Sequence, residues 1–315
     1  MDTILIAGVD SVVGAALAGA LAGADRVVGT ARRSAGLSAI GGCELAAAAG
    51  DDERSVRQLF ATLAPCWTIY CGPGAESCWN EPPRAARDHD AVQAAGTWAR
   101  AARDAGSEFT CISSDAVFTG PRMFHDESSR GLCGSLHAQH LRAIEAAVLQ
   151  DHPAALVVRT HVFGWTPEEC GAGWIERILN ALEDGTARPF DAIRHATPIL
   201  AADFADVLLK TREAFLSGVY HIAGAERTSP ARFVGRLAQE FGLDAPACGP
   251  PASLLERPCA FGCGETSLRT TKIRTALGVS LPTLADGLRR LREEHDNGDR
   301  ECLPAAPVEL HELAA

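Results

Sequence analysis

Short apolar runs without charged residues recur along the first half of this chain, separated by longer segments with helical spacing. A strand buried on both faces of a parallel sheet gives a continuous apolar run, whereas a half-exposed strand alternates with polar residues. Strands and helices in alternation predict an α/β protein with a doubly wound parallel sheet. The predicted strands are residues 4–6, 27–29, 68–71, 109–112 and 155–159, and predicted helices end at residues 21, 63 and 105.

The pattern becomes less regular after residue 165. We expect a helix at 174–182, a late strand at 218–224, and a helix at 230–241 that Ser229 caps, because Ser is a favoured N-cap residue. The Pro-rich residues 246–258 indicate a linker or a loop of a smaller lobe. The expected division is a Rossmann-like nucleotide-binding domain at 1–165 to which 201–224 return, a small C-terminal α/β substrate lobe at 166–200 and 225–295, and a mobile tail at 296–315.

A glycine turn between the first strand and the first helix carries the main chemical signal. Such a turn is where a dinucleotide pyrophosphate meets a helix N-terminus. Gly8 and Gly14 occupy the outer places of the fingerprint, but Ser11 takes the middle place. Ser fits where the backbone needs no positive φ, and its hydroxyl could face a phosphate. We favour a nucleotide site; the alternative is a domain that kept its packing glycines and lost its nucleotide.

Arginines after the second strand bear on the choice of cofactor. An acidic residue there would hold a ribose 2′-hydroxyl, whereas arginine suits a 2′-phosphate, so Arg32 and Arg33 favour NADP(H) over NAD(H). The alternative is that both arginines are solvated loop residues without a ligand. The possibility that the protein binds no cofactor also stays open. The residues expected to contact a cofactor are Gly8, Ser11, Val12, Val13, Gly14, Arg32, Arg33, Asp51, Cys71 and Gly72.

Composition narrows the class of protein. At 315 residues with 47% hydrophobic residues, the chain can bury a full core. The net charge of −11, without a basic block, argues against nucleic-acid binding. The eleven cysteines are scattered, odd in number and form no Cys-x-x-Cys pair, which indicates reduced thiols in a cytoplasmic protein and no metal site. No segment is long and apolar enough to span a membrane, so we expect a soluble protein.

Five motifs, taken in order, resemble the extended short-chain dehydrogenase/reductases, and among them the dTDP-4-dehydrorhamnose reductase (RmlD-like, sugar-nucleotide-binding) family. The resemblance covers about residues 3–293. Each motif alone is unspecific, but their shared order makes the match specific. The motifs are ISSDAVFTG, VVRTHVFG, TPILAADFADVLL, GVYHIAG and RPCAFGCGETSLRTTKIRTALG. The resemblance implies an NAD(P)-binding oxidoreductase, a sugar-nucleotide substrate, and a homodimer.

The chain departs from this family at the catalytic residues. The family uses a Ser or Thr after the central strand, followed by a Tyr and a Lys four residues apart on the next helix. The first position corresponds to Ser114, but alignment through Glu145 puts His137 at the Tyr position and Leu141 at the Lys position. An offset register puts Cys133 and His137 there instead. Both members of the Tyr–Lys pair are therefore missing.

Histidine is a possible replacement for the missing tyrosine. Because the reference pKa of imidazole is about 6.5, against about 10 for a phenol, His137 is expected to exchange protons near neutrality without a neighbouring Lys. His140 lies one turn away and is a second catalytic candidate beside Ser114. His161, at a family position usually held by Ser, and Arg257, which the family uses near the substrate diphosphate, are the expected substrate contacts.

Three functions remain open at this point. The favoured one is an atypical NAD(P)-binding enzyme acting on a carbonyl of a nucleotide-sugar or other small polar substrate, with His137 in place of the Tyr. The second is a proton-transfer enzyme without hydride transfer, catalysing elimination, isomerisation or cyclisation. The third is an inactive nucleotide-binding or partner-binding subunit, in which His137 is only a helix-surface residue.

Overall fold

The computed structural model describes residues 2–31, 40, 43–46, 52–77, 79, 90–167, 170–188, 190–245 and 264–298. Four predicted site residues, Arg32, Arg33, Asp51 and Arg257, lie outside these ranges.

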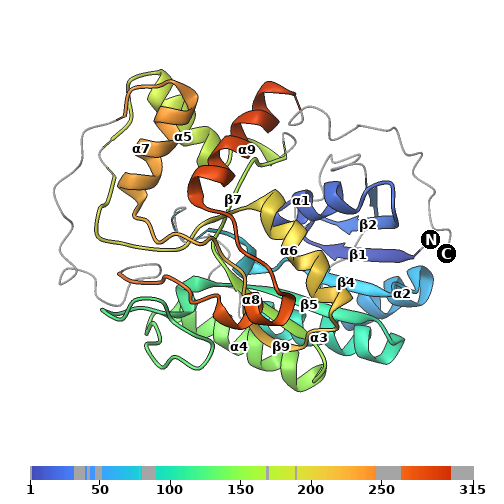
Figure 1. The fold of residues 1–315 in the computed structure, drawn as a ribbon. Coiled ribbons are helices and arrows are strands. Elements are labelled where there is room, and N and C mark those ends of the chain that lie inside the picture. Colours follow the sequence, from blue (N-terminus) through green and yellow to red (C-terminus); the bar gives the residue numbers. More distant parts are fainter. Residues whose placement is uncertain are drawn as a thin grey trace.

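A parallel sheet forms the centre of the molecule (Figure 1). The described strands follow the order β3-β2-β1-β4-β5-β6-β9, and every neighbouring pair is parallel. The chain order reverses between β1 and β4, which is where doubly wound folds bind their ligands. The Rossmann-like α/β fold is confirmed. The strands are β1 (Thr3–Ala7), β2 (Arg26–Thr30), β3 (Glu44–Leu45), β4 (Trp67–Tyr70), β5 (Glu108–Ser114), β6 (Leu156–Thr160) and β9 (Gly218–His221).

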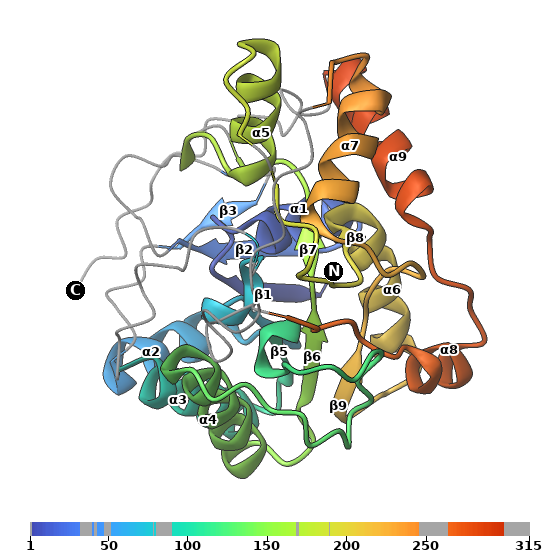
Figure 2. The same cartoon turned by 90° about the vertical axis from the view of Figure 1, so that its left-hand side faces the viewer.

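Helices cover both faces of the sheet, which explains the apolar runs in the strands. Ile4 and Ile6 of β1 point into a core shared with one group of helices, while Leu5 and Ala7 point into the core on the other face. Figure 2 shows the two groups on opposite sides of the strands. The first group contains α1 (Val12–Leu21), α6 (Ala201–Glu213) and α8 (Thr271–Leu277), and the second contains α2 (Glu53–Leu63), α3 (Asp90–Ala105) and α4 (Leu136–Asp151).

Three further helices share an apolar core of their own. They are α5 (Trp174–Glu183), α7 (Pro230–Phe241) and α9 (Leu284–Asp296), and they lie together at the top of Figure 1. Ser229 caps α7 as expected, and a capping box at Thr283 begins α9. A short sheet of β7 (Val162–Phe163) and β8 (Ile199–Leu200) leads toward these helices. The exact division into two domains stays a prediction; α8 lies within the predicted lobe range, yet its Ile273 belongs to the core of the main sheet.

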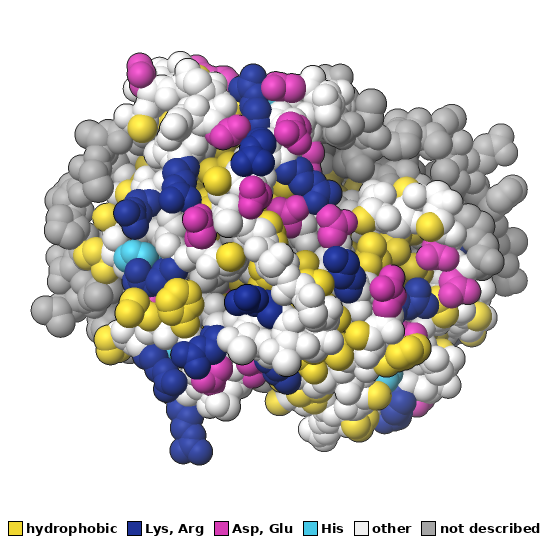
Figure 3. All heavy atoms as spheres, in the orientation of Figure 1, with side chains coloured by type: hydrophobic (Ala, Val, Ile, Leu, Met, Phe, Trp, Pro, Cys, Tyr) yellow, Lys and Arg dark blue, Asp and Glu magenta, His cyan; other side chains and the backbone are white. Residues whose placement is uncertain are grey.

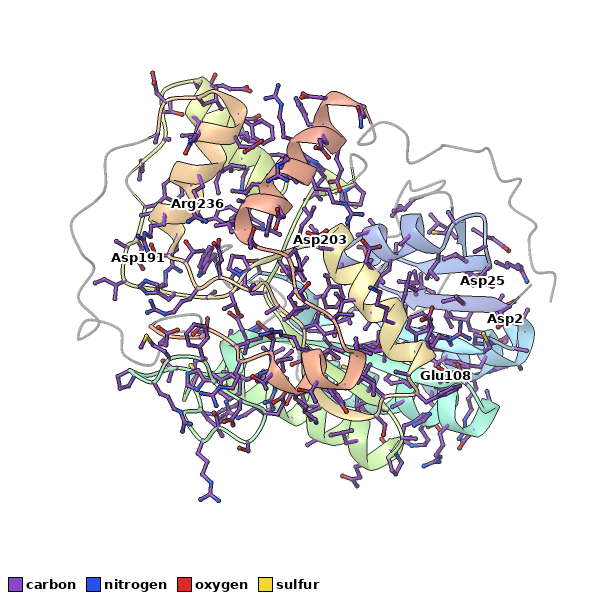
Figure 4. The ribbon with its side chains drawn as sticks, in the orientation of Figure 1. Asp2, Asp25, Glu108, Asp191, Asp203 and Arg236 are labelled. Carbon is purple, nitrogen blue, oxygen red and sulfur yellow. The ribbon has the colours of Figure 1, made fainter. Side chains whose placement is uncertain are left out.

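The two ends of the strands face different surroundings. Asp2, Asp25 and Glu108 lie at the amino-terminal ends of β1, β2 and β5, on the right of Figure 4, whereas Asp191 lies at the opposite side. Figure 2 views the molecule from that opposite side, where the strands end. The face in Figure 3 carries Lys and Arg side chains intermingled with Asp and Glu. None of the helices in the described ranges combines the length and apolar character needed to cross a bilayer.

Candidate active site

The turn after β1 has the geometry that the two glycines predict. Gly8 has φ +88°, and its N–H donates to Thr30 O at 2.8 Å. A Cβ at Gly8 would collide with the carbonyl oxygen of Cys71, and a Cβ at Gly14 would collide with the carbonyl oxygen of Gly8. Both positions therefore require glycine, the first for its backbone conformation and the second for the close approach of α1.

Ser11 replaces the middle glycine without strain, because its φ is −89°. Its Oγ accepts the N–H of Gly14 at 3.0 Å and donates to Gly8 O at 2.7 Å. The hydroxyl thus caps α1 and closes the turn rather than facing a phosphate. The N–H groups of Val12 and Val13 precede the first helical hydrogen bond, from Ala15 N to Ser11 O, so they are the donors that α1 offers an anion.

This turn fits the phosphates of a dinucleotide. The first turn of α1 contains no acidic residue, so nothing there opposes the positive end of the helix dipole. Cys71 and Gly72 follow β4 beside this turn, at the point where the strand order reverses. The predicted cofactor residues in this region thus lie together at the carboxyl ends of β1 and β4. They are Gly8, Val12, Val13, Gly14, Cys71 and Gly72. Their contact with a cofactor stays a prediction.

Ser114 lies at the carboxyl end of β5 and begins the short helix η3 (Asp115–Val117). Its Oγ accepts the N–H of Ala116 at 3.1 Å and donates to Asp115 Oδ1 at 3.2 Å. The side chain is buried. Ser114 is therefore placed on a rigid element at the strand end where the family has its catalytic hydroxyl, and it also supports the carboxylate of Asp115.

A continuous row of hydrogen bonds joins three neighbouring strand ends. Nδ1 of His161, after β6, lies 3.0 Å from Asp115 Oδ2, after β5. Nε2 of the same ring lies 3.0 Å from Oγ of Ser77, in the loop after β4. Thr266 Oγ1 donates to Asp115 Oδ2 at 2.6 Å. We call Ser77, His161 and Asp115 the buried row; it holds both imidazole nitrogens in fixed positions.

Trp79 lies against the buried row. Its ring meets that of His161 edge-on at 4.6 Å between centroids, and its backbone N–H donates to Ser77 Oγ at 3.2 Å. The same indole contacts Trp174 of α5 and Phe233 of α7. The buried row thus lies where the sheet meets the core of α5, α7 and α9.

His137 is buried in the first turn of α4, and its surroundings change its expected chemistry. Burial, with a smaller contribution from the charge of His140, lowers the pKa of His137 from 6.5 to about 4. The expectation that His137 exchanges protons near neutrality is therefore wrong for this site. At pH 7 the imidazole is neutral, so it can offer an N–H hydrogen bond but is not a charged acid. His140, one turn on, is half-buried.

The position that alignment through Glu145 matches to the family's Lys is apolar. Leu141 is 2% exposed and packs in a small cluster with Val117, Phe118, Ala223 and Leu268. A leucine in this cluster cannot bind ribose hydroxyls or lower the pKa of a neighbouring acid. In the register that places Leu141 at the Lys position, the chain lacks the family's contact to the nicotinamide ribose; this register stays a prediction.

A buried ion pair joins α4 to β6. Arg159 of β6 binds Glu145 of α4 through two hydrogen bonds, at 2.9 and 2.6 Å, and Ser113 donates to the same carboxylate at 2.5 Å. This pair holds α4 against β5 and β6 at Glu145. Leu141 and His137 lie one and two helical turns before Glu145. The correspondence of His137 to the family's Tyr stays a prediction.

A cavity of about 520 Å³ lies outside this constellation, along the outer side of α1 and against α6 and α9. Of the predicted site residues only Val12 lines it. Among the described residues no group of His, Cys, Asp or Glu is arranged to hold a metal ion.

The structure thus brings Ser114 and His161 together through Asp115, and places His137 beside His140. Sequence reasoning missed Ser77, Asp115 and Thr266 as site residues. Ser77 stands in the Gly- and Pro-rich loop after β4, and Asp115 stands inside the ISSDAVFTG motif. A histidine after β6, a carboxylate after β5 and a hydroxyl after β4 were the sequence features that could have indicated this group.

Relatives with solved structures share the fold over nearly the whole chain. The dTDP-4-dehydrorhamnose reductase of Bacillus anthracis, solved with NADP, is 19% identical, with a TM-score of 0.76 over 93% of this chain and 99% of that one. The enzyme WbmH of Bordetella bronchiseptica, solved with NAD+, is 15% identical, with a TM-score of 0.75 over 94% of this chain and 99% of that one. At these identities the likeness shows the fold.

A relative of higher identity is the probable low-salt glycan biosynthesis reductase Agl14 of Haloferax volcanii. It is 27% identical over 202 residues, which are 63% of this chain and 67% of the relative. Residues 1–296 match the family described as the RmlD substrate binding domain. This match covers the sheet, the turn after β1 and the helices α5, α7 and α9, and the chain belongs to this family.

Proposed function

We propose that this protein binds a nicotinamide dinucleotide at the turn after β1 and acts on a carbonyl of a nucleotide-linked sugar or another small polar substrate. The observation that carries the proposal is the turn itself: Gly8 and Gly14 permit the close backbone approach, and the first turn of α1 contains no acidic residue. When bound, such a cofactor supplies or accepts a hydride. Relatives crystallised with NADP or NAD+ support the choice of cofactor.

The protein's own residues would orient and polarise the substrate carbonyl. Ser114 is held at the end of β5. Its hydroxyl, which donates to Asp115 in this structure, could donate to a substrate oxygen instead. His137 is neutral at pH 7, because its pKa is about 4, and it would donate a hydrogen bond rather than transfer a proton. In this proposal Ser114 and His137, two neutral hydrogen-bond donors, take the place of the family's Tyr–Lys pair.

A second candidate is proton transfer without hydride transfer in the same crevice. The apolar cluster around Leu141 favours it, because this cluster removes the residue that would bind the nicotinamide ribose. Elimination, isomerisation and cyclisation need only acid and base groups and an oriented carbonyl. A subunit that binds a nucleotide without turnover is the third reading.

Calorimetric titration with NADPH, NADP and NADH, each separately, tests the proposal. We expect micromolar binding, with a preference for the phosphorylated forms if Arg32 or Arg33 holds the 2′-phosphate. Absence of binding by all three would contradict the proposed cofactor site and leave cofactor-free chemistry or a partner protein.

The role of His137 is tested by His137→Leu. Turnover of a carbonyl substrate should be lost while cofactor affinity stays within about twofold, since the substitution removes a hydrogen-bond donor remote from the phosphates. The matched control is His152→Leu, at the C-cap of α4, where the ring lies 3.2 Å from Ser107 O. Unchanged turnover in His137→Leu would remove His137 from the mechanism.

A further inference from the structure

We propose that the buried row of Ser77, His161 and Asp115 is a nucleophilic triad that hydrolyses carboxylic esters with a small acyl group, an activity separate from the carbonyl chemistry proposed above. Ser77 is the nucleophile, His161 the general base and acid, and Asp115 the residue that orients the ring. The activity needs no dinucleotide.

Hydrogen-bond directions within the row fit this assignment. The carboxylate of Asp115 can only accept, and it accepts from Ser114 at Oδ1 and from Thr266 at Oδ2. Nδ1 of His161, 3.0 Å from Oδ2, therefore carries a hydrogen, and in the neutral ring the lone pair is on Nε2. That lone pair faces Ser77 Oγ at 3.0 Å, so the serine hydroxyl hydrogen points at the imidazole. A base within hydrogen-bond reach of the nucleophile, itself oriented by a carboxylate, is the arrangement that activates serine.

The supporting structure holds each member rigidly. Asp115 begins η3, and His161 lies between β6 and β7, where its carbonyl accepts the N–H of Ile199 at 2.9 Å. The ring of Trp79 packs edge-on against the imidazole and restricts its rotation. All three members follow the carboxyl ends of adjacent strands, β4, β5 and β6, which is the edge where this class of fold binds ligands.

Exposure identifies the end of the row that meets a substrate. Asp115 is fully buried and His161 is 1% exposed, whereas Ser77 keeps 6% exposure. The charged end is therefore inside the protein and the hydroxyl end is nearest the surface. The low exposure of Ser77 favours a small acyl group over a large one.

The reaction balances with water as the second reactant. Ser77 Oγ attacks the ester carbonyl carbon, and its proton passes to His161 Nε2. His161 returns this proton to the leaving alcohol as the carbon–oxygen bond breaks, which leaves an ester of Ser77. Water, deprotonated by the same nitrogen, then releases the carboxylic acid and restores the hydroxyl. No oxidant or reductant takes part.

A fluorophosphonate reagent and p-nitrophenyl acetate test the triad directly. Intact-mass and peptide analysis should show one phosphonyl group on Ser77 in the wild-type chain. Ser77→Ala should lose this adduct and the burst of p-nitrophenol. His161→Gln should slow labelling of Ser77 by about 100-fold or more, which is what loss of a general base costs. The matched control is Ser107→Ala. Ser107 is another buried serine, and it is hydrogen-bonded to Thr68 at the amino-terminal ends of the strands. In this variant Ser77 should be labelled at the wild-type rate.

Two results would overturn the proposal: no adduct on Ser77 in the folded wild-type protein, or equal labelling rates for wild type and a folded His161→Gln. If His161→Gln does not fold, Ser77→Cys gives the same information, because the introduced thiol should react with iodoacetamide at pH 6 faster than the native cysteines. A thiol no faster than these contradicts activation by His161. Calorimetric binding of NADPH is measured independently, so failure of the triad and failure of the cofactor site are distinguishable.

Discussion

Ser11 preserves the hydrogen bonds of the turn after β1 but adds a side chain at the position of the family's middle glycine. Its hydroxyl caps α1 through Gly14, yet its side chain stands where the family's glycine lets the backbone approach a pyrophosphate. Ser11→Gly should cost only a few tenths of a kcal/mol in unfolding free energy, whereas Ser11→Ala should cost about 1 kcal/mol.

The same pair of variants also reports on the cofactor. We expect Ser11→Gly to bind NADPH more tightly than the wild type, because it restores room at the turn, and Ser11→Ala to bind no more tightly. Urea denaturation and calorimetry measure the two effects on the same samples. Binding by Ser11→Gly no tighter than that of the wild type would show that room at the turn does not limit affinity.

His137 makes the folded state sensitive to acid. Its pKa is lowered to about 4, below the value of 6.5 expected in the unfolded chain, so the unfolded state takes up the proton first as the pH falls. Between pH 6.5 and 4 this histidine should cost the folded state roughly 3 kcal/mol, at 1.36 kcal/mol per pKa unit. His221, whose pKa burial lowers to about 3, acts in the same direction.

Urea denaturation at pH 7, 6, 5 and 4.5 checks this prediction. His137→Gln should lose stability with a shallower slope than the wild type over this range. The two proteins compared at pH 7.5 provide the control, since the histidine is neutral in both states there. Parallel pH profiles would contradict the lowered pKa.

At the scale of elements, the ion pair between Glu145 and Arg159 fastens α4 to β6. Both side chains are nearly buried, at 6% and 10% exposure. Glu145→Gln leaves the guanidinium with an uncharged partner and should lower the free energy of unfolding by about 3 kcal/mol. Glu53→Gln, which breaks an exposed pair with Arg57 on α2, should change it by less than about 1 kcal/mol. Equal effects in chemical denaturation would contradict the structural role of the buried pair.

Most elements could be predicted from sequence because their signals are local. The apolar runs predict the strands, and Ser229 is the N-cap of α7 as the sequence predicts. The pair β7–β8 was missed, since two-residue strands have no measurable period. The site was predicted less well than the elements: burial sets the pKa of His137, and the contact of His161 with Ser77 joins residues 84 positions apart. Neither property is visible in a linear pattern.

At the scale of the whole molecule, ligands of the two parts should stabilise the protein independently. A dinucleotide at 100 times its dissociation constant should add about 2.7 kcal/mol to the free energy of unfolding. If the substrate is nucleotide-linked, as proposed, a nucleoside diphosphate should raise the Tm further in the presence of NADPH. Scanning calorimetry with each ligand and with both checks this prediction. Loss of the dinucleotide shift when the diphosphate is added would indicate one shared site.

The apolar cluster around Leu141 also limits which substitutions the fold accepts. Restoring the family's pair by His137→Tyr with Leu141→Lys would place an ammonium group among Val117, Phe118 and Leu268, with the guanidinium of Arg159 already 5.0 Å from the Phe118 ring. Such a cation is costly to bury without a counter-charge. We therefore expect His137→Tyr with Leu141→Lys to destabilise the fold, because the apolar surroundings of Leu141 would have to accept a charge.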